Sequence, residues 1–133
     1  DEVDKVEKRG GKTVGRLVAI GDGLHNFTDG LAIGAAFRAD LASGLATALA
    51  VLTHELPHEL GDFAVLLKTG TSVRRAICYN VLSSVISYLG MAIGIYLGHL
   101  NGASHWIYSV TAGSFLYIGL ADLVILNSPI RLA

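Results

Sequence analysis

Four long apolar segments, separated by short polar breaks, constrain this sequence more than any other feature. They cover residues 17–37, 41–67, 76–97 and 106–126. A helix rises about 1.5 Å per residue, so about 20 apolar residues cross the roughly 30 Å hydrocarbon core of a bilayer. None of the segments shows the sustained period-two alternation that is typical of strands. The sequence therefore predicts an all-α membrane protein with four transmembrane helices.

The distribution of charge excludes several other classes of protein. Of the 21 Lys, Arg, Asp and Glu residues, nine lie in the first sixteen positions, which leaves 12 for the other 117 residues. A soluble domain carries about 25% charged residues over its whole length. The net charge of −1 argues against a nucleic-acid partner. The single cysteine, Cys78, excludes an internal disulfide framework and a cysteine zinc cluster.

The basic residues predict how the four segments are oriented. In a four-span zigzag, nine of them fall on one side and Arg38 falls alone on the other. The nine are Lys5, Lys8, Arg9, Lys12, Arg16, Lys68, Arg74, Arg75 and Arg131. The positive-inside rule places this side in the cytoplasm. We therefore expect a cytoplasmic loop or tail over residues 1–13 and a membrane domain over 14–133. The alternative, a soluble protein with deeply buried helices, does not account for this partition.

Ionisable and strongly polar residues interrupt the first two apolar segments. A charged side chain at the centre of a membrane helix costs about 2.5–3.5 kcal/mol on insertion scales. Facing lipid, nine such groups would be prohibitive, so they must face one another, water or a cation. The nine are Asp22, His25, Asn26, Asp29, His54, Glu55, His58, Glu59 and Asp62.

The spacing of these residues predicts a metal site. His25 and Asp29 are four residues apart, as are His54 and His58, so each pair lies on one helix face. Packed face to face, the two pairs give a mixed nitrogen and oxygen set of four, which suits zinc. Imidazole must be neutral to bind a metal, so affinity should fall as the pH drops through about 6.5.

Further oxygen donors lie beside this set and predict a second cation site. Asn26, Glu55 and Glu59 are each one position along from a histidine, and His58 or a glutamate could bridge the two sites. Asp22 and Asp62 are expected to support the ligands or to line an ion pathway. Pro57 lacks an N–H group, so it leaves the Thr53 carbonyl without its helical partner beside the site.

Small residues predict close packing between helices. Gly30 and Gly34 form a G-x-x-x-G pair, and Gly90, Gly94 and Gly98 extend the same spacing over two turns. Such faces let helix backbones approach closely in lipid. The pattern does not identify the partner helix of either face.

The motifs HNFTDG at 25–30 and HELPHELGD at 54–62 together resemble the paired signature of the ZIP (Zrt/Irt-like) metal transporter family. The second motif has the form of one large animal subfamily. The resemblance implies an eight-helix transporter fold of which the four segments are spans four to seven. It also implies that a binuclear centre between two helices passes zinc into the cytosol.

The resemblance also implies roles for individual residues. His25, Asp29, His54 and His58 correspond to the primary metal site. Asn26 and Glu55 correspond to the second site, with His58 at the bridging position and Glu59 adjacent. His54 favours zinc, with manganese, iron and cadmium as other cargoes. The implied setting is a multi-pass protein among membrane lipid, in the plasma membrane or an endomembrane, paired with itself or with a family relative.

Two other functions fit parts of the sequence. His54-Glu55-Leu56-Pro57-His58 matches H-E-x-x-H, the zinc motif of metalloproteases, in which Glu55 would activate a zinc-bound water. Pro57 within the ligand helix disfavours that use. Because only four spans are present, the chain could instead be a truncated variant that does not transport and regulates an intact relative.

Overall fold

Four α-helices make up nearly all of the chain. The computed structural model describes the backbone of residues 2–100 and 102–127, and describes side chains from residue 13 onward except at 14, 101, 118, 119 and 121–133. The helices are α1 (Glu2–Ala39), α2 (Leu41–Lys68), α3 (Val73–Leu97) and α4 (Ala103–Asn127). The prediction of an all-α chain with four helices is confirmed, and each of the last three begins within three residues of the expected start. Arg131, counted in the charge argument, lies outside the described residues.

The N-terminal segment differs from the prediction. Residues 2–13, expected to form a loop or tail, are the first turns of α1. Most residues before Gly10 are Glu, Lys, Arg and Val, and the charged ones among them have high helix propensity. Gly10 and Gly11 each cost about 1 kcal/mol in a helix interior, which is not enough to end it. The charged composition of this segment therefore extends the helix beyond its apolar part.

Specific residues end and begin the helices. Asp40 caps α2, where its carboxylate accepts hydrogen bonds from Ser43 N (2.8 Å) and Ser43 Oγ (2.6 Å). The next two connections contain Gly70 and Gly102 at φ values of 80° and 82°, a backbone region that favours glycine. These short connections make successive helices antiparallel.

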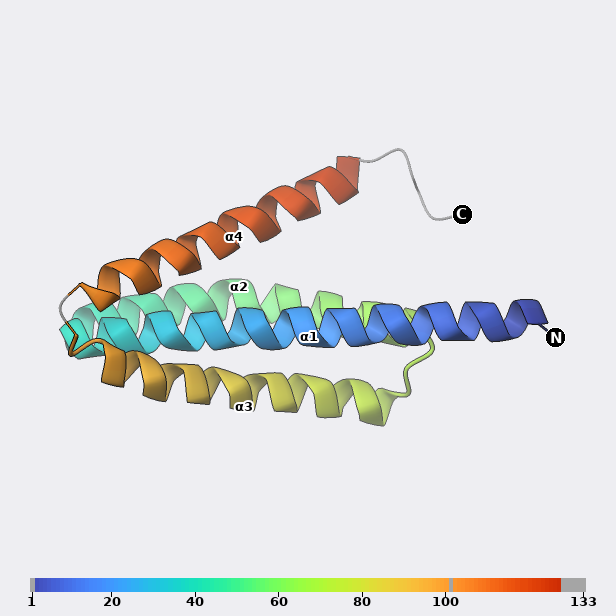
Figure 1. Ribbon diagram of the computed structural model, residues 1–133, viewed down its shortest axis with the longest axis horizontal. Coiled ribbons are helices and arrows are strands. Elements are labelled where there is room, and N and C mark those ends of the chain that lie inside the picture. The colour runs from blue at the N-terminus through green and yellow to red at the C-terminus, as the bar shows by residue number, and fades with distance from the viewer. Residues whose placement is uncertain (1, 101, 128–133) are drawn as a thin grey trace.

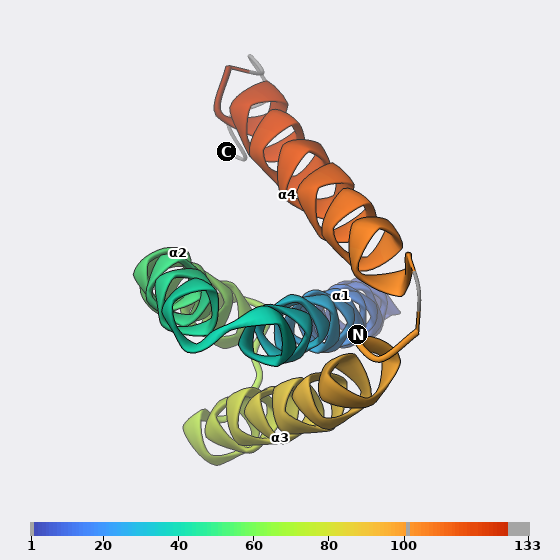
Figure 2. The same ribbon diagram turned by 90° about the vertical axis from the view of Figure 1, so that its left-hand side faces the viewer.

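The helices surround α1, which lies at the centre of the bundle (Figure 1). Viewed from the end, α1, α2 and α3 form a triangle, and α4 lies on the other side of α1 (Figure 2). In both views α4 inclines away from the other three helices toward its C-terminal end. The α1–α2 and α3–α4 connections are at one end of the bundle and the α2–α3 connection is at the other. This alternation agrees with the zigzag used to interpret the loop charges.

The glycine faces of α1 and α3 pack directly against each other. A Cβ atom at Gly30 would overlap the carbonyl oxygen of Ser87, and one at Gly34 would overlap that of Met91. The relation is reciprocal, because a Cβ at Gly90 would overlap the carbonyl of Phe27. The structure thus identifies the partner that the sequence left open: each G-x-x-x-G face meets the other.

The outward surface of the bundle is apolar. On α2, leucines at helical spacing are 54–71% exposed: Leu41, Leu45, Leu49, Leu52, Leu56 and Leu60. Exposed apolar surface on this scale indicates contact with lipid or with other protein. Among the described residues, α3 alone passes a test for membrane spans based on length and apolar composition. α1 and α2 are longer, but they contain the polar residues described next.

Candidate metal centre

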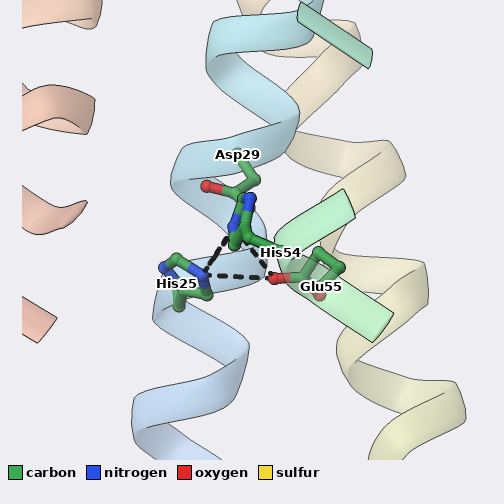
Figure 3. Close-up of side chains that lie close together, drawn as sticks. All are labelled: His25, Asp29, His54 and Glu55. Carbon is green, nitrogen blue, oxygen red and sulfur yellow. Dashed lines mark hydrogen bonds and ion pairs between the residues drawn. The ribbon is translucent and has the colours of Figure 1, made fainter. Parts of the chain in front are cut away.

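Four side chains from α1 and α2 converge at one point between these helices (Figure 3). The Nε2 atom of His25 lies 3.1 Å from Glu55 Oε1 and 3.6 Å from Asp29 Oδ2. The Nε2 atom of His54 lies 3.1 Å from Asp29 Oδ2 and 3.6 Å from Glu55 Oε1. The two Nε2 atoms are 3.3 Å apart. We call these four residues the first cluster.

The spacing within the first cluster fits a tetrahedral zinc ion. Zinc binds histidine nitrogen and carboxylate oxygen at about 2.0–2.2 Å, which places tetrahedral ligands about 3.3–3.6 Å from one another. The four histidine–carboxylate distances and the distance between the two Nε2 atoms run from 3.1 to 3.6 Å. All four ligand atoms lie within 4.8 Å of one another. The residues therefore already have the separations that a shared zinc ion requires.

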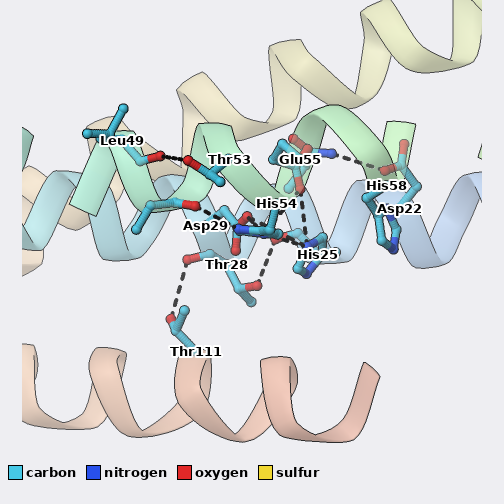
Figure 4. A network of polar contacts seen from close by, with 12 residues as sticks. Asp22, His25, Thr28, Asp29, Leu49, Thr53, His54, Glu55, His58 and Thr111 are labelled. Atoms are coloured by element: carbon cyan, nitrogen blue, oxygen red, sulfur yellow. Dashed lines mark hydrogen bonds and ion pairs between the residues drawn. The ribbon is translucent and has the colours of Figure 1, made fainter. Parts of the chain in front are cut away.

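Local contacts orient the ligands. His54 Nδ1 lies 3.2 Å from the carbonyl oxygen of Ala50, a group that can only accept a hydrogen bond (Figure 4). The Nδ1 atom is therefore the donor, and a neutral His54 directs the lone pair of Nε2 into the cluster. In this tautomer of His54, no proton lies between Nε2 and Asp29 Oδ2. A cation is the group that would relieve this contact between two electron-rich atoms.

Burial strengthens the case for a cation. Asp29 is fully buried and His25 is 5% exposed. Within the described part of the chain, both Asp29 oxygens and Glu55 Oε1 are buried without a hydrogen-bond partner, and their ion-pair contacts are with the two cluster histidines. A buried carboxylate without such partners is strongly disfavoured unless a positive charge compensates it. A divalent ion between the four side chains would supply that charge.

A second group of ligands lies beside the first, toward the α2–α3 connection. Asp22, His58 and Asp62 each offer one ligand atom within 4.8 Å of the others. His58 Nδ1 is 3.7 Å from Asp62 Oδ2, and its ring centroid lies 5.1 Å from that of His25. These three residues, the second cluster, line a cavity of about 450 Å³ that also reaches His25. The two clusters are thus adjacent steps along one face of α1.

The grouping differs in part from the predicted one. His25, Asp29 and His54 come together as expected, but Glu55 takes the fourth position and His58 lies in the second cluster. The residues expected to have supporting roles, Asp22 and Asp62, are the oxygen donors there. Residues four apart differ by about 6 Å in height along a helix. His25 and Asp29 nevertheless meet in the first cluster, whereas His54 and His58 belong to different clusters, so this spacing alone does not decide which residues share a cluster.

The other predicted residues lie around the clusters. The buried Asn26 donates a hydrogen bond from Nδ2 to Asp22 Oδ1 at 3.1 Å, so its amide positions a second-cluster ligand. Glu59 is not part of either cluster, and its Oε2 atom is buried without a hydrogen-bond partner among the described residues.

Two residues of α4 that were not predicted lie near the centre, and one of them, Phe115, contacts the first cluster. The Phe115 ring packs edge-on against both imidazoles, with centroids 4.7 Å from His54 and 5.7 Å from His25. Thr111 donates to the Ile107 carbonyl at 2.9 Å and lies 3.5 Å from the Thr28 carbonyl of α1 (Figure 4). In a membrane segment, the sequence pattern does not distinguish one phenylalanine or threonine from another. Only the position of α4 shows that these two residues lie near the centre. Phe115 shields one side of the first cluster.

The arrangement does not suit a metalloprotease. In H-E-x-x-H enzymes both histidines bind one zinc ion and the glutamate stays free to activate water. Here His54 and His58 belong to different clusters, and Glu55 is itself among the ligand atoms of the first. The site is better suited to holding a cation with four ligands than to catalysis.

Comparison with known proteins gives a consistent result. A family model described as "ZIP Zinc transporter" matches residues 1–129. The chain is 56% identical over 122 residues to "Zinc transporter ZIP6" of Homo sapiens, which covers 91% of this chain and 16% of that protein. It is 53% identical over 108 residues to "Zinc transporter foi" of Drosophila melanogaster, covering 81% and 15% of the two chains.

A third relative carries a broader name. "Metal cation symporter ZIP14" of Danio rerio is 49% identical over 111 residues, covering 84% of this chain and 22% of that protein. The chain thus spans less than a quarter of the length of each of these relatives. No solved structure matches it.

Proposed function

Because this chain belongs to the ZIP zinc transporter family, a family of membrane proteins and not of enzymes, we propose that it provides the metal pathway of a zinc transporter. Zinc would be held between α1 and α2 and released into the cytosol. The observation that carries the proposal is the first cluster, whose ligand atoms are 3.1–3.6 Å apart and largely buried. These are the separations of a tetrahedral zinc site.

The two clusters support a stepwise path. An ion leaving the first cluster would meet His58 and two carboxylates in the adjoining cavity of about 450 Å³. This cavity lies toward the end of the bundle that carries Arg16, Lys68 and Arg75, the end assigned to the cytosol by its charge. Conduction requires binding that is strong enough for an ion to enter and weak enough for it to leave. A second site next to the first helps the ion to leave, because it offers new ligands as the first ones are lost.

The wider setting extends the proposal. The four helices are taken as spans four to seven of an eight-helix fold, with exposed leucines of α2 facing lipid or neighbouring spans. We further propose that the protein lies in the plasma membrane and assembles with a second copy or with a family relative. Its cargo would be zinc in preference to manganese, iron or cadmium. The histidines of the first cluster support the choice of zinc, because imidazole suits zinc better than it suits manganese.

Uptake of radiolabelled zinc by cells that express the complete gene product tests the proposal. We expect His54→Ala combined with His58→Ala, which removes a ligand from each cluster, to abolish uptake with the protein still at the membrane. His105→Ala, at an exposed position outside both clusters, is the matched control. Unchanged uptake in the double variant would contradict the proposal. Peptidase activity lost in Glu55→Gln while zinc still binds would favour the protease instead.

A further inference from the structure

A polar pocket lies at the end of the bundle where α2 connects to α3. Its volume is about 190 Å³, and it is separate from both metal clusters. Its walls come from the first half of α1, the connection and the first turns of α3: Gly15, Arg16, Thr69, Gly70, Thr71, Arg75 and Tyr79. No acidic side chain is among these residues, so the pocket combines two positive charges with three hydroxyl groups.

The positive charges in this pocket are uncompensated. Among the residues with described side chains, neither Arg16 nor Arg75 forms an ion pair. The N-terminus of α3 adds to the positive potential of the pocket, and its N-cap residue Ser72 makes no side-chain capping bond. The free N–H groups of a helix N-terminus attract anions. The pocket therefore suits a group with negative charge and several acceptor oxygens, such as a phosphate.

An apolar groove continues from this pocket along the bundle. The groove has a volume of about 650 Å³ and lies between α1 and α3. It shares Arg16 and Tyr79 with the polar pocket. Its other walls are Ala19, Ile20, Gly23, Leu24, Phe27, Leu82, Ser83 and Ile86. A charged pocket that opens onto a long apolar groove has the shape and polarity of a phospholipid, with a headgroup at one end and acyl chains at the other.

We propose that the pocket and groove bind an anionic phospholipid of the cytoplasmic leaflet. Its phosphate would accept hydrogen bonds from Arg16, Arg75 and the Tyr79 hydroxyl, and one acyl chain would lie in the groove. The charge argument places this end of the bundle at the cytoplasmic surface, where anionic lipids are concentrated. The inference rests on the membrane setting of the proposed function and not on zinc transport, so either can fail without the other.

Native mass spectrometry of the complete protein in detergent tests the headgroup contact. The probes are dioleoyl phosphatidic acid, dioleoyl phosphatidylcholine and inorganic phosphate. We expect phosphatidic acid to bind more tightly than phosphatidylcholine, and Arg16→Gln with Arg75→Gln to weaken its binding by about 30-fold. Lys68→Gln with Arg74→Gln is the matched control, since it removes two positive charges close by that do not line the pocket. Equal losses in the two double variants, or equal binding of the two lipids, would overturn the proposal.

A second variant tests the acyl chain. At Gly23 a Cβ would lie 3.4 Å from Ile86 Cδ1, the end of a flexible side chain, and Gly23 lines the groove, so Gly23→Leu adds a side chain there. We expect Gly23→Leu to weaken the binding of phosphatidic acid and to leave the affinity for zinc unchanged. Gly113→Leu on α4, with nothing within 4 Å of its Cβ position, is the control. The proposal would be contradicted if inorganic phosphate bound as tightly as phosphatidic acid and Gly23→Leu had no effect. The pocket would then be a site for free anions.

Discussion

The two faces of α1 differ sharply, although they are formed by neighbouring residues. Asp29 points toward α2 and contributes to the first cluster, whereas Gly30 contacts the backbone of α3. On the α3 side, the absence of side chains lets two backbones touch. On the α2 side, imidazoles and carboxylates from both helices meet, with ligand atoms 3.1–3.6 Å apart.

One helix thus combines a close backbone contact with a more open one. At the contact glycines, the approach of α1 to α3 leaves no space for a side chain. The ligands contributed by α2 are more exposed than those of α1: the His54 side chain is 34% exposed, whereas that of His25 is 3%. The α1–α3 pair is therefore the more closely packed one, and α2 contributes the more exposed side chains of the first cluster.

The largest effect is expected from filling the glycine face. Gly90→Leu would place a side chain where the Phe27 carbonyl now lies, and neither backbone can yield. Overpacking typically costs about 1–3 kcal/mol, and a backbone clash should reach or exceed the upper end. Thermal unfolding of the protein in detergent measures the loss. An unaltered melting temperature would mean that α1 and α3 do not pack in this way.

A change on the other face should separate binding from stability. Asp29→Asn keeps the shape of a fully buried side chain but removes its charge. We expect a loss of zinc affinity of roughly 100-fold or more, since even residues that only support a ligand contribute about 10–100-fold. The metal-free protein should become no less stable, because an uncompensated buried carboxylate is costly. Calorimetry with zinc and thermal melts without it provide the two readouts, and a destabilised metal-free variant would argue against the cation site.

A smaller effect on zinc affinity distinguishes the ligand set seen in the structure from the set predicted by the sequence. Glu55→Gln removes charge from the first cluster, whereas His58→Ala alters the second. We expect the tighter of two zinc-binding steps to weaken by about 10-fold or more in Glu55→Gln and to change less in His58→Ala. Titration calorimetry resolves the steps. The reverse order would return His58 to the primary site.

The smallest effect is expected at the junction between α1 and α2, which belongs to neither face. Hydrogen bonds from Ser43 lower the pKa of the exposed Asp40 carboxyl from its ordinary value. A lowered folded-state pKa stabilises the protein above the unfolded value, about 3.9, and the contribution disappears as the pH falls through the lower folded value. Asp40→Ala should therefore reduce the melting temperature slightly at pH 7, with the difference from the parent shrinking below about pH 4. A difference independent of pH would assign the effect to something other than the carboxylate.

Much of this molecule can be read from local spacing. The four helices follow from apolar length, and His25, Asp29 and His54 follow from polar residues at i, i+4 spacing in segments that should contain none. These inferences hold because helix periodicity and the cost of polar groups in lipid act within one segment. The helical N-terminal segment does not follow in this way, because a polar, charged composition predicts a loop, whereas Glu, Lys and Arg also favour helices.

The sequence by itself determined which polar residues the first two helices bring together and which glycines permit close packing. Only the tertiary structure decided that Glu55 joins the first cluster in place of His58, that the two glycine faces meet each other, and that Phe115 covers the site. The reason is that residue spacing sets positions on one helix, whereas the rotation and the axial offset between helices depend on packing along their whole length.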